Sequence, residues 1–204
     1  MLRKIKMHNI FWGILGERRC LMLDTVRMGT QKVSKAEYKV RFKELVNRLV
    51  VLQQEAKKQE LGMVVLFEGW KGAGKGSRIS DLLYHLDARD TSVYVTEDFD
   101  DKEAALVLDE DFGATGYYPF LQQFWKALGQ RGSMTFYDRG WYSVAAQHII
   151  NALPKKGKLS KKERGTIKAH AARMVKSIED FETQLRNDGY LVIKFFLQIS
   201  EKTQ

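Results

Sequence analysis

The sequence predicts an α/β fold, a three-layer αβα sandwich in which a parallel β-sheet lies between two layers of helices. The first observation is an apolar run at 63–68 that enters a glycine-rich turn and is followed at once by a helical pattern. The second is another apolar run, 134–138, which ends in an aspartate. The third is the alternation of strand-like and helical segments, which is typical of parallel sheets because their crossovers are usually helices.

The first predicted element is a long amphipathic helix. It begins at a capping box, Ser34-Lys35-Ala36-Glu37, and ends near Gly62. Its apolar stripe is expected to pack against the rest of the domain or against a second subunit, and it contains Tyr38, Phe42, Leu45, Leu49 and Leu52.

The later elements follow from their periodicity. In chain order we expect a strand at 63–68, a helix ending near 86, a strand at 92–96, helices at 117–128 and 142–151, a strand at 134–138 between them, a helix from the capping box at 160–163 to about 187, and a strand at 190–197. In the helix that ends near 86, the predicted core positions are Ile79, Leu82, Leu83 and Leu86. In the helix at 117–128 they are Phe120, Leu121, Phe124, Trp125 and Leu128.

The glycine-rich turn fits the phosphate-loop (Walker A) pattern G-x-x-x-x-G-K at Gly69 and Gly74-Lys75. Backbone N–H groups in such a loop surround phosphate oxygens, and the helix that follows directs its positive end to the same point. The predicted phosphate-binding residues are Gly69, Gly72, Ala73, Gly74, Lys75, Gly76 and Ser77. Gly76 stands where Ser or Thr normally holds Mg²⁺, with Ser77 one place later. The alternative is a tight connection without a ligand.

Asp138 ends the strand at 134–138 and is followed by Arg139. In a phosphate-loop enzyme such a strand lies beside the first one, and its carboxylate reaches the Mg²⁺ on the phosphates. The interval after Lys75 is long enough for the crossovers of a parallel sheet. Arg139 offers a planar guanidinium to phosphate. We therefore predict Asp138 as a metal ligand and Lys75, Asp138 and Arg139 as catalytic residues. The alternative is a structural ion pair at a strand end.

Composition narrows the class of protein. The chain has 204 residues, 44% of them hydrophobic and 29% charged, which is typical of a single globular domain. The net charge of +9 favours a polyanionic partner such as nucleic acid, polyphosphate or a nucleotide, or else only aids solubility. A single cysteine, Cys20, excludes an internal disulfide and fits a reducing, cytoplasmic location. The four histidines are scattered and are expected at the surface or an interface, without a zinc site.

Three segments have no assigned function. Residues 1–30 are expected to be an N-terminal extension, because their apolar run at 10–15 is too short for a secretory signal or a membrane span. The extension is either mobile or lies upstream of a true start at Met22 or Met28, and a membrane-surface helix is the minor alternative. The acidic segment at 97–111 either lies near bound Mg²⁺ or is a solvated loop and helix. The basic cluster at 155–164 either guides a polyanion or is a solvated loop.

Four stretches occur in the same order as in the type-2 polyphosphate kinase family, which the chain resembles over roughly residues 34–204. They are Phe67-Glu68-Gly69 through Gly74-Lys75-Gly76, Pro119-Phe120-Leu121-Gln122-Gln123-Phe124-Trp125, Asp138-Arg139-Gly140-Trp141-Tyr142, and Ile193-Lys194-Phe195-Phe196-Leu197-Gln198-Ile199-Ser200. The chain is most similar to one half of the tandem polyphosphate:AMP phosphotransferases. The G-K-G ending and the D-R-x-W-Y element are much more specific together than either is alone.

The resemblance implies a P-loop kinase-like domain and Mg²⁺-dependent phosphoryl transfer between inorganic polyphosphate and a nucleoside mono- or diphosphate. Lys75 and the loop amides would hold nucleotide phosphates, Asp138 would bind Mg²⁺ or orient the acceptor phosphate, and Arg139 would neutralise the moving phosphoryl group. The expected partners are inorganic polyphosphate, a nucleotide (AMP or ADP, or GDP or ATP) and further copies of the chain in a homo-oligomer. No nucleic acid or membrane partner is expected.

The sequence also departs from the family pattern. Lys71 stands where the family carries a metal-site aspartate, Gln123 where it carries an arginine, and Gly140 where it carries a serine. The family continues into a helical lid with further arginines, so 31–204 is expected to be the kinase-like domain truncated before the lid, either a fragment or a degenerate half. These departures predict that the fold and phosphate binding survive better than catalysis.

Two other functions fit the same residues. One is a catalytically silent phosphate-loop domain that binds polyphosphate or a partner subunit, which Lys71 favours. The other is a nucleoside-monophosphate kinase of the thymidylate type, which also pairs a phosphate loop with Asp-Arg. Gly76 and the continuation Trp141-Tyr142 weigh against that type.

Overall fold

The structure is a computed structural model, and it describes residues 33–96, 120–151, 153 and 159–199. The predicted extension at 1–30, the acidic segment at 97–111 and positions 155–158 of the basic cluster lie outside the described residues.

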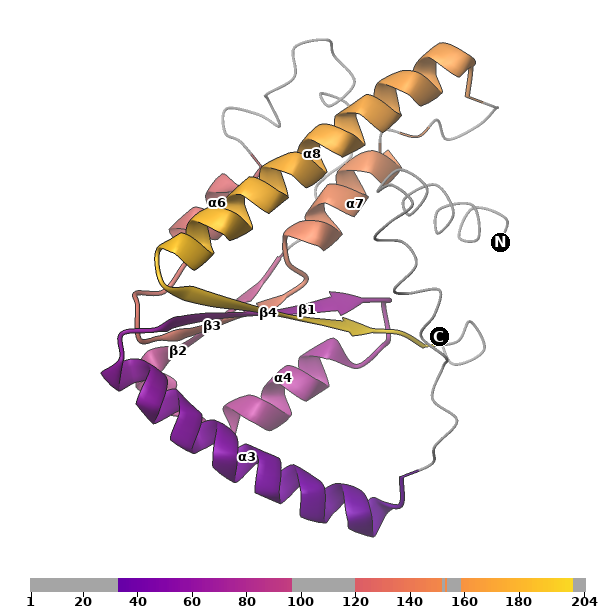
Figure 1. Cartoon of the computed structure of the whole chain (residues 1–204). Coiled ribbons are helices and arrows are strands. Elements are labelled where there is room, and N and C mark those ends of the chain that lie inside the picture. The colour runs from indigo at the N-terminus through magenta and orange to yellow at the C-terminus, as the bar shows by residue number, and fades with distance from the viewer. Residues whose placement is uncertain (1–32, 97–119, 152, 154–158, 200–204) are drawn as a thin grey trace. The chain divides into compact units, whose positions relative to one another are not determined.

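The described elements alternate between helix and strand, as predicted (Figure 1). In chain order they are α3 (Lys35–Lys58), β1 (Gly62–Gly69), α4 (Lys75–Leu83), the 3₁₀ turn η1 (Ala88–Asp90), β2 (Thr91–Val95), α6 (Gln122–Lys126), β3 (Met134–Asp138), α7 (Trp141–Asn151), α8 (Lys161–Asn187) and β4 (Tyr190–Leu197). The four strands form one sheet in the order β2-β3-β1-β4, and every neighbouring pair is parallel. This confirms the predicted α/β fold with a parallel sheet.

The chain divides into two compact units. One contains the whole sheet with α3 and α4, and it comprises Gln31–Thr96, Gln123–Ser143 and Phe181–Gln204. The other comprises Met1–Thr30, Glu97–Gln122 and Val144–Asp180, of which the structure describes chiefly α7 after its first turn and most of α8.

Both faces of the sheet are covered within the first unit. Figure 1 shows α3 and α4 on one side, where buried side chains of the sheet pack against those helices. This core contains Ala56, Met63, Val65, Phe67, Ile79, Leu86, Met134 and Phe136, and Leu82 and Leu83 pack against it. The predicted core face of the helix after the glycine-rich turn is therefore confirmed.

The opposite face of the sheet carries an aromatic cluster. The ring of Phe124 lies 5.4 Å from that of Tyr137 and 5.5 Å from that of Trp141, and Trp141 lies 5.0 Å from Phe181 at the end of α8. All four side chains are nearly inaccessible to solvent. Edge-to-face contacts of this kind add to the stabilisation that burial itself provides.

The packed face of α3 agrees only in part with the predicted stripe, because Leu49 packs against the core and Phe42 is half-buried. Tyr38, Leu45 and Leu52 are exposed, and the buried positions are Val46, Gln53 and Ala56. The prediction was wrong for Tyr38, Leu45 and Leu52, because a buried polar residue anchors the helix along a different line.

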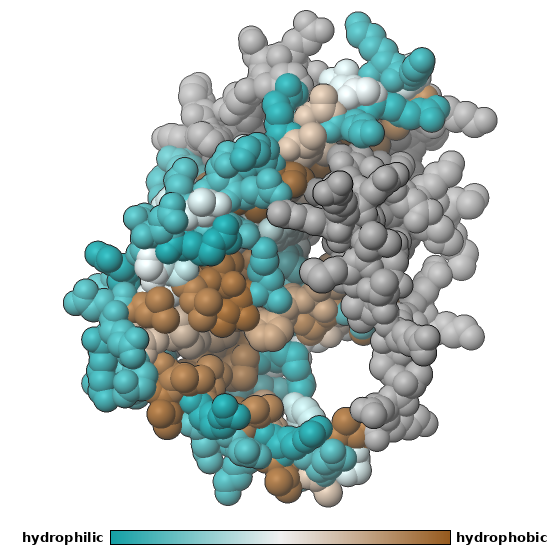
Figure 2. All heavy atoms as spheres, viewed as in Figure 1, coloured by the Kyte–Doolittle hydropathy of each residue, from teal (hydrophilic) through white to brown (hydrophobic). Residues whose placement is uncertain are grey.

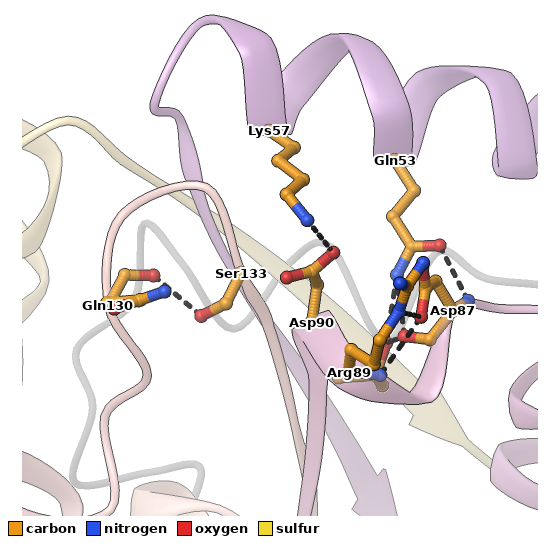
Figure 3. Close-up of polar contacts among 8 residues, drawn as sticks. Gln53, Lys57, Asp87, Arg89, Asp90, Gln130 and Ser133 are labelled. Atoms are coloured by element: carbon orange, nitrogen blue, oxygen red, sulfur yellow. Dashed lines mark hydrogen bonds and ion pairs between the residues drawn. The ribbon is translucent and has the colours of Figure 1, made fainter.

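The amide of Gln53 is fully buried and points toward η1, as Figure 3 shows. It donates to Thr91 Oγ1 (2.9 Å) and accepts from the N–H of Asp87 (2.9 Å). Lys57, one turn further along, pairs with Asp90. A sequence pattern that counts only apolar side chains misses such an anchor.

The aromatic-rich helix predicted at 117–128 is shorter where the structure describes it. Helix α6 ends at Lys126 because the hydroxyl of Tyr137 donates to the carbonyl of Phe124 at 3.2 Å. The N–H of Leu128 donates instead to Trp125, which gives a tighter final turn. Phe124 and Leu121 are buried as predicted, whereas Trp125 is 41% exposed.

Strand β4 lies at one edge of the sheet, and its exposed hydrophobic side chains include Leu191, Phe195 and Phe196. Figure 2 shows hydrophobic side chains gathered over β4 and below it toward α3 and α4. No helix within the described ranges is long and apolar enough to cross a membrane.

His148 in the second unit is buried, whereas every histidine was expected at the surface or an interface. Its ring packs 6.3 Å from that of Phe120. Burial, and then the charge of His170, lower the pKa of His148 to about 4. The imidazole is therefore neutral in the folded protein at neutral pH.

We expect the folded protein to lose stability as the pH falls from 6.5 to 4. In this window the unfolded chain binds a proton at His148 that the folded protein does not bind, so the free energy of unfolding decreases by about 3 kcal/mol. Urea titrations at several pH values measure this change. In His148→Gln, the free energy of unfolding should fall clearly less, relative to that variant's own value at pH 7, than it does in the wild type. An equal change in both proteins would contradict the assignment.

A close approach of two strands explains the first loop glycine. Gly69 has φ of 125°, and a Cβ there would lie 2.1 Å from the carbonyl oxygen of Leu197 on β4. Gly72 has a φ of 83°, but the space around its Cβ position is open. We expect Gly69→Ala to lower the free energy of unfolding by about 3 kcal/mol, from strain and overlap, and Gly72→Ala by about 1 kcal/mol. Urea unfolding of both variants tests this, and equal losses would contradict it.

Candidate functional site

The connection between β1 and α4 has the backbone of an anion-binding loop. Gly69, Gly72 and Gly74 all have positive φ, and Gly74 is the left-handed N-cap residue of α4. No side chain caps this end of the helix. The N–H groups of its first turn have no partner within the helix, and they face the position where an anion would be stabilised.

Lys75 lies inside this loop. The side chain is buried, with 9% of the residue exposed, and its Nζ donates to the carbonyl oxygens of Gly69 (3.1 Å) and Trp70 (3.0 Å). The two carbonyls hold the ammonium group within the loop. Its positive charge is thereby placed beside the open N–H groups of the first turn of α4.

Asp138 lies at the same edge of the sheet. Strands β1 and β3 are paired in parallel with Phe67 opposite Asp138, so the loop and the aspartate both follow the carboxyl ends of neighbouring strands. A Cβ placed on Gly76 would lie 3.4 Å from Oδ2 of Asp138. The structure therefore brings Lys75, Gly76 and Asp138 together. A Ser or Thr side chain at this position would lie next to the carboxylate.

Arg139 has a left-handed backbone with φ of 66°, which is uncommon for a residue other than glycine. Its N–H donates to the carbonyl of Phe67 at 3.0 Å. On the other side, the hydroxyl of the buried Thr96 donates to the carbonyl of Arg139, and the N–H of Thr96 donates to Asp138 at 3.1 Å. Contacts from Phe67 of β1 and from Thr96, the residue after β2, thus hold the Asp138-Arg139 turn.

The other predicted phosphate-binding residues differ in what their amides can do. The N–H of Ala73 donates to the carbonyl of Trp70 at 3.2 Å, so this amide is engaged within the loop. Gly76 and Ser77 lie in the exposed first turn of α4. Lys71 is exposed in the loop.

Sequence reasoning missed a buried acidic residue that contacts the two residues at the start of α7, just after the Asp138-Arg139 turn. Glu182 on α8 accepts hydrogen bonds from Nε1 of Trp141 (3.0 Å) and the hydroxyl of Tyr142 (2.8 Å), and it pairs with Lys194 of β4 (2.9 Å). These contacts give the Trp141-Tyr142 pair after Arg139 a structural role, because they join the start of α7 to α8 and β4. Only the three-dimensional structure reveals this partner, which lies forty residues along the chain.

The residues at the loop can accommodate Mg²⁺ with phosphate. Mg²⁺ is usually held by one or two carboxylates together with substrate phosphates and water, and Asp138 supplies such a carboxylate. Across the described ranges, no three or more His, Cys, Asp or Glu side chains come together as a metal-binding group. A metal here would therefore depend largely on phosphate oxygens for its ligands.

Known proteins are similar to this chain in sequence. The model of the family described as "Polyphosphate kinase 2 (PPK2)" matches residues 32–204. A polyphosphate:AMP phosphotransferase from Pseudomonas aeruginosa is 28% identical over 90% of this chain and 32% of its own length. One from Pseudomonas syringae is 32% identical over 70% of this chain and 24% of its own length. The chain thus spans about a third or less of these two relatives.

Solved structures show the same fold. The crystal structure of a Pseudomonas aeruginosa protein assigned to polyphosphate kinase 2 matches with a TM-score of 0.67 and 27% identity, over 89% of this chain and 34% of that one. A polyphosphate kinase 2 from Arthrobacter aurescens matches with a TM-score of 0.67 at 20% identity, over 88% of this chain and 58% of that one, and shows the fold alone. Because the family model covers most of the sequence, the chain belongs to the polyphosphate kinase 2 family.

Proposed function

We propose that this chain carries out Mg²⁺-dependent phosphoryl transfer between inorganic polyphosphate and a nucleoside mono- or diphosphate. The observation that supports this best is how near the first turn of α4 lies to Asp138, because a Cβ placed on Gly76 would be 3.4 Å from the carboxylate. It places the phosphate loop beside an acidic residue in a chain of the polyphosphate kinase 2 family. The family match favours this function over a nucleoside-monophosphate kinase of the thymidylate type.

Each residue of the site has a role in the proposed reaction. The first-turn amides of α4 and the ammonium of Lys75 hold phosphate oxygens. Asp138 binds Mg²⁺ or orients the acceptor phosphate, and Arg139 neutralises the phosphoryl group as it moves. Phosphoryl transfer depends mainly on positioning and on stabilising charge in the transition state, which these groups supply.

Mg²⁺ bound to the phosphates would supply charge neutralisation and hold the reacting oxygens in place. Asp138 is the residue proposed to hold it. The acidic segment at 97–111 follows β2 directly in the sequence and is a further candidate for this role. The proposed partners are inorganic polyphosphate, a nucleotide and further copies of the chain in a homo-oligomer, and the proposed location is the cytoplasm.

Lys71 supports a second candidate, a domain that binds polyphosphate or a partner subunit without catalysis. It adds an exposed positive charge to the loop that already contains Lys75. Like charges in one loop favour polyanion binding, but the same change removes the carboxylate that the family resemblance implies at the metal site. Both candidate functions therefore predict phosphate binding, but only the phosphoryl-transfer enzyme is expected to turn over substrate.

The first test incubates the protein with long-chain polyphosphate, Mg²⁺ and AMP or ADP and follows new nucleotide by chromatography. Lys75→Met and Asp138→Asn are each expected to lower the rate by roughly 100-fold, because each removes a charge that stabilises the transition state. Lys43→Met, an exposed position on α3, is the control and should keep the wild-type rate. Transfer from ATP but not from polyphosphate would instead support a nucleoside-monophosphate kinase.

Substitution of Lys71 tests the second candidate. Lys71→Asp is expected to raise the transfer rate by roughly 10-fold and to lower the Mg²⁺ concentration needed, because it removes repulsion and adds a carboxylate. Lys71→Ala is the matched control and removes only the charge. If wild type and both variants bind tripolyphosphate in calorimetry but form no product, the domain is a binding module rather than an enzyme.

A further inference from the structure

Glu68 is a buried carboxylate that the proposed reaction does not use. It is the last residue but one of β1, directly before Gly69, and is only 6% exposed. Its neighbour Phe67 belongs to the core on the α3 and α4 side, so Glu68 faces the opposite side of the sheet. Burying a carboxylate is costly unless it is hydrogen-bonded, so the contacts of this side chain indicate its role.

Those contacts lie at the beginning of α7. The hydroxyl of Ser143, the third residue of that helix, donates to Oε2 of Glu68. Oε1 lies 3.0 Å from the position that a Cβ on Gly140 would occupy. Helix α7 has no acidic residue in its own first turn. The carboxyl group of Glu68 therefore lies at the N-terminus of a helix that has no acidic residue of its own there, a position where negative charge is favoured.

The surroundings act on Glu68 in opposite directions. Burial is the largest effect and leaves the pKa of Glu68 raised above its ordinary value, while the side chain of Ser143 and the backbone of Ser143, Gly140 and Tyr142 act to lower the pKa. The start of α7 thus favours the ionised carboxylate in a place where burial alone would disfavour it.

The Asp138-Arg139 turn lies between the two ends of this contact. Upstream, the N–H of Arg139 donates to Phe67, the residue before Glu68. Downstream, Ser143 donates to Glu68 itself, and a Cβ placed on Gly140 would lie 3.0 Å from Oε1 of Glu68. The left-handed conformation of Arg139, with φ of 66°, persists only where neighbouring structure holds it. Two successive residues of β1 hold this turn, one through its carbonyl and one through its side chain.

We propose that Glu68 is a positioning residue which, through Ser143 and the first turn of α7, holds Asp138 and Arg139 in register with the phosphate loop. The role in catalysis rests on the function proposed above, whereas the role in holding the turn does not. Because Glu68 adjoins Gly69, one residue links the loop that binds phosphate to the turn that carries the metal-binding and phosphate-neutralising groups.

Amide hydrogen exchange tests the structural half of the proposal without requiring activity. In Glu68→Gln and in Ser143→Ala, the amides of Arg139 and Thr96, which bond to Phe67 and Asp138, should exchange at least roughly 10-fold faster. The amide of Met63, at the other end of the same strand pair, should be unchanged. Ser143→Ala removes only the hydrogen-bond donor to Glu68. The proposal can therefore still be tested with this variant if Glu68→Gln folds poorly. Unchanged exchange at Arg139, or equal acceleration at Met63, would overturn the proposal.

Transfer kinetics test the catalytic half. Glu68→Gln and Ser143→Ala are expected to lower kcat by roughly 10- to 100-fold with KM for the nucleotide changed less than about 3-fold, because Lys75 and the loop amides remain in place. The double variant should be no slower than the slower single variant, since both act through one contact. Glu44→Gln, exposed on α3, is the control. Unchanged kcat would overturn this role, and an inactive wild type would reject the proposed function while the exchange result stands.

Discussion

The parallel pairing of β1 with β3 is the constraint on which the site depends. It sets Phe67 opposite Asp138, so that the phosphate loop and the Asp138-Arg139 turn emerge at one edge of the sheet. A strand of five residues is about 16 Å long at roughly 3.3 Å per residue. An antiparallel arrangement would place the aspartate at the far end of that distance from Lys75. The long crossover between the strands is the structural cost of bringing the two groups together.

Backbone conformation at the site is held from several directions. Gly69 passes so close to β4 that no side chain fits, and Gly74 begins α4 in the left-handed region. Arg139 adopts a left-handed conformation although it is not a glycine. Phe67 and Thr96 bond to its backbone, and Glu68 holds the start of the next helix. Strain of this kind is common where a functional group must be held in one orientation.

The face of the sheet opposite α3 and α4 supports this edge. Trp141 is completely buried against Phe124, Tyr137 and Phe181, and its Nε1 donates to Glu182. A buried indole without an acceptor would lose stability, so the acidic partner makes the aromatic packing possible. Lys194 in turn compensates the charge of Glu182. The residues that follow Arg139 thus have a packing role, distinct from the role proposed for Arg139 itself.

The sequence by itself determined the order of strands and helices, the parallel sheet and the juxtaposition of loop and aspartate, because these depend on local periodicity, glycine spacing and the geometry of strand ends. Tertiary structure alone decided how α3 is anchored, since the buried amide of Gln53 finds its partners in Asp87 and Thr91, on either side of η1. It also decided the early end of α6, where the Tyr137 hydroxyl occupies a helix carbonyl, and the burial of His148. Thr96, Glu68 and Glu182 gain their roles from partners between twelve and seventy-five residues away, which no local pattern encodes.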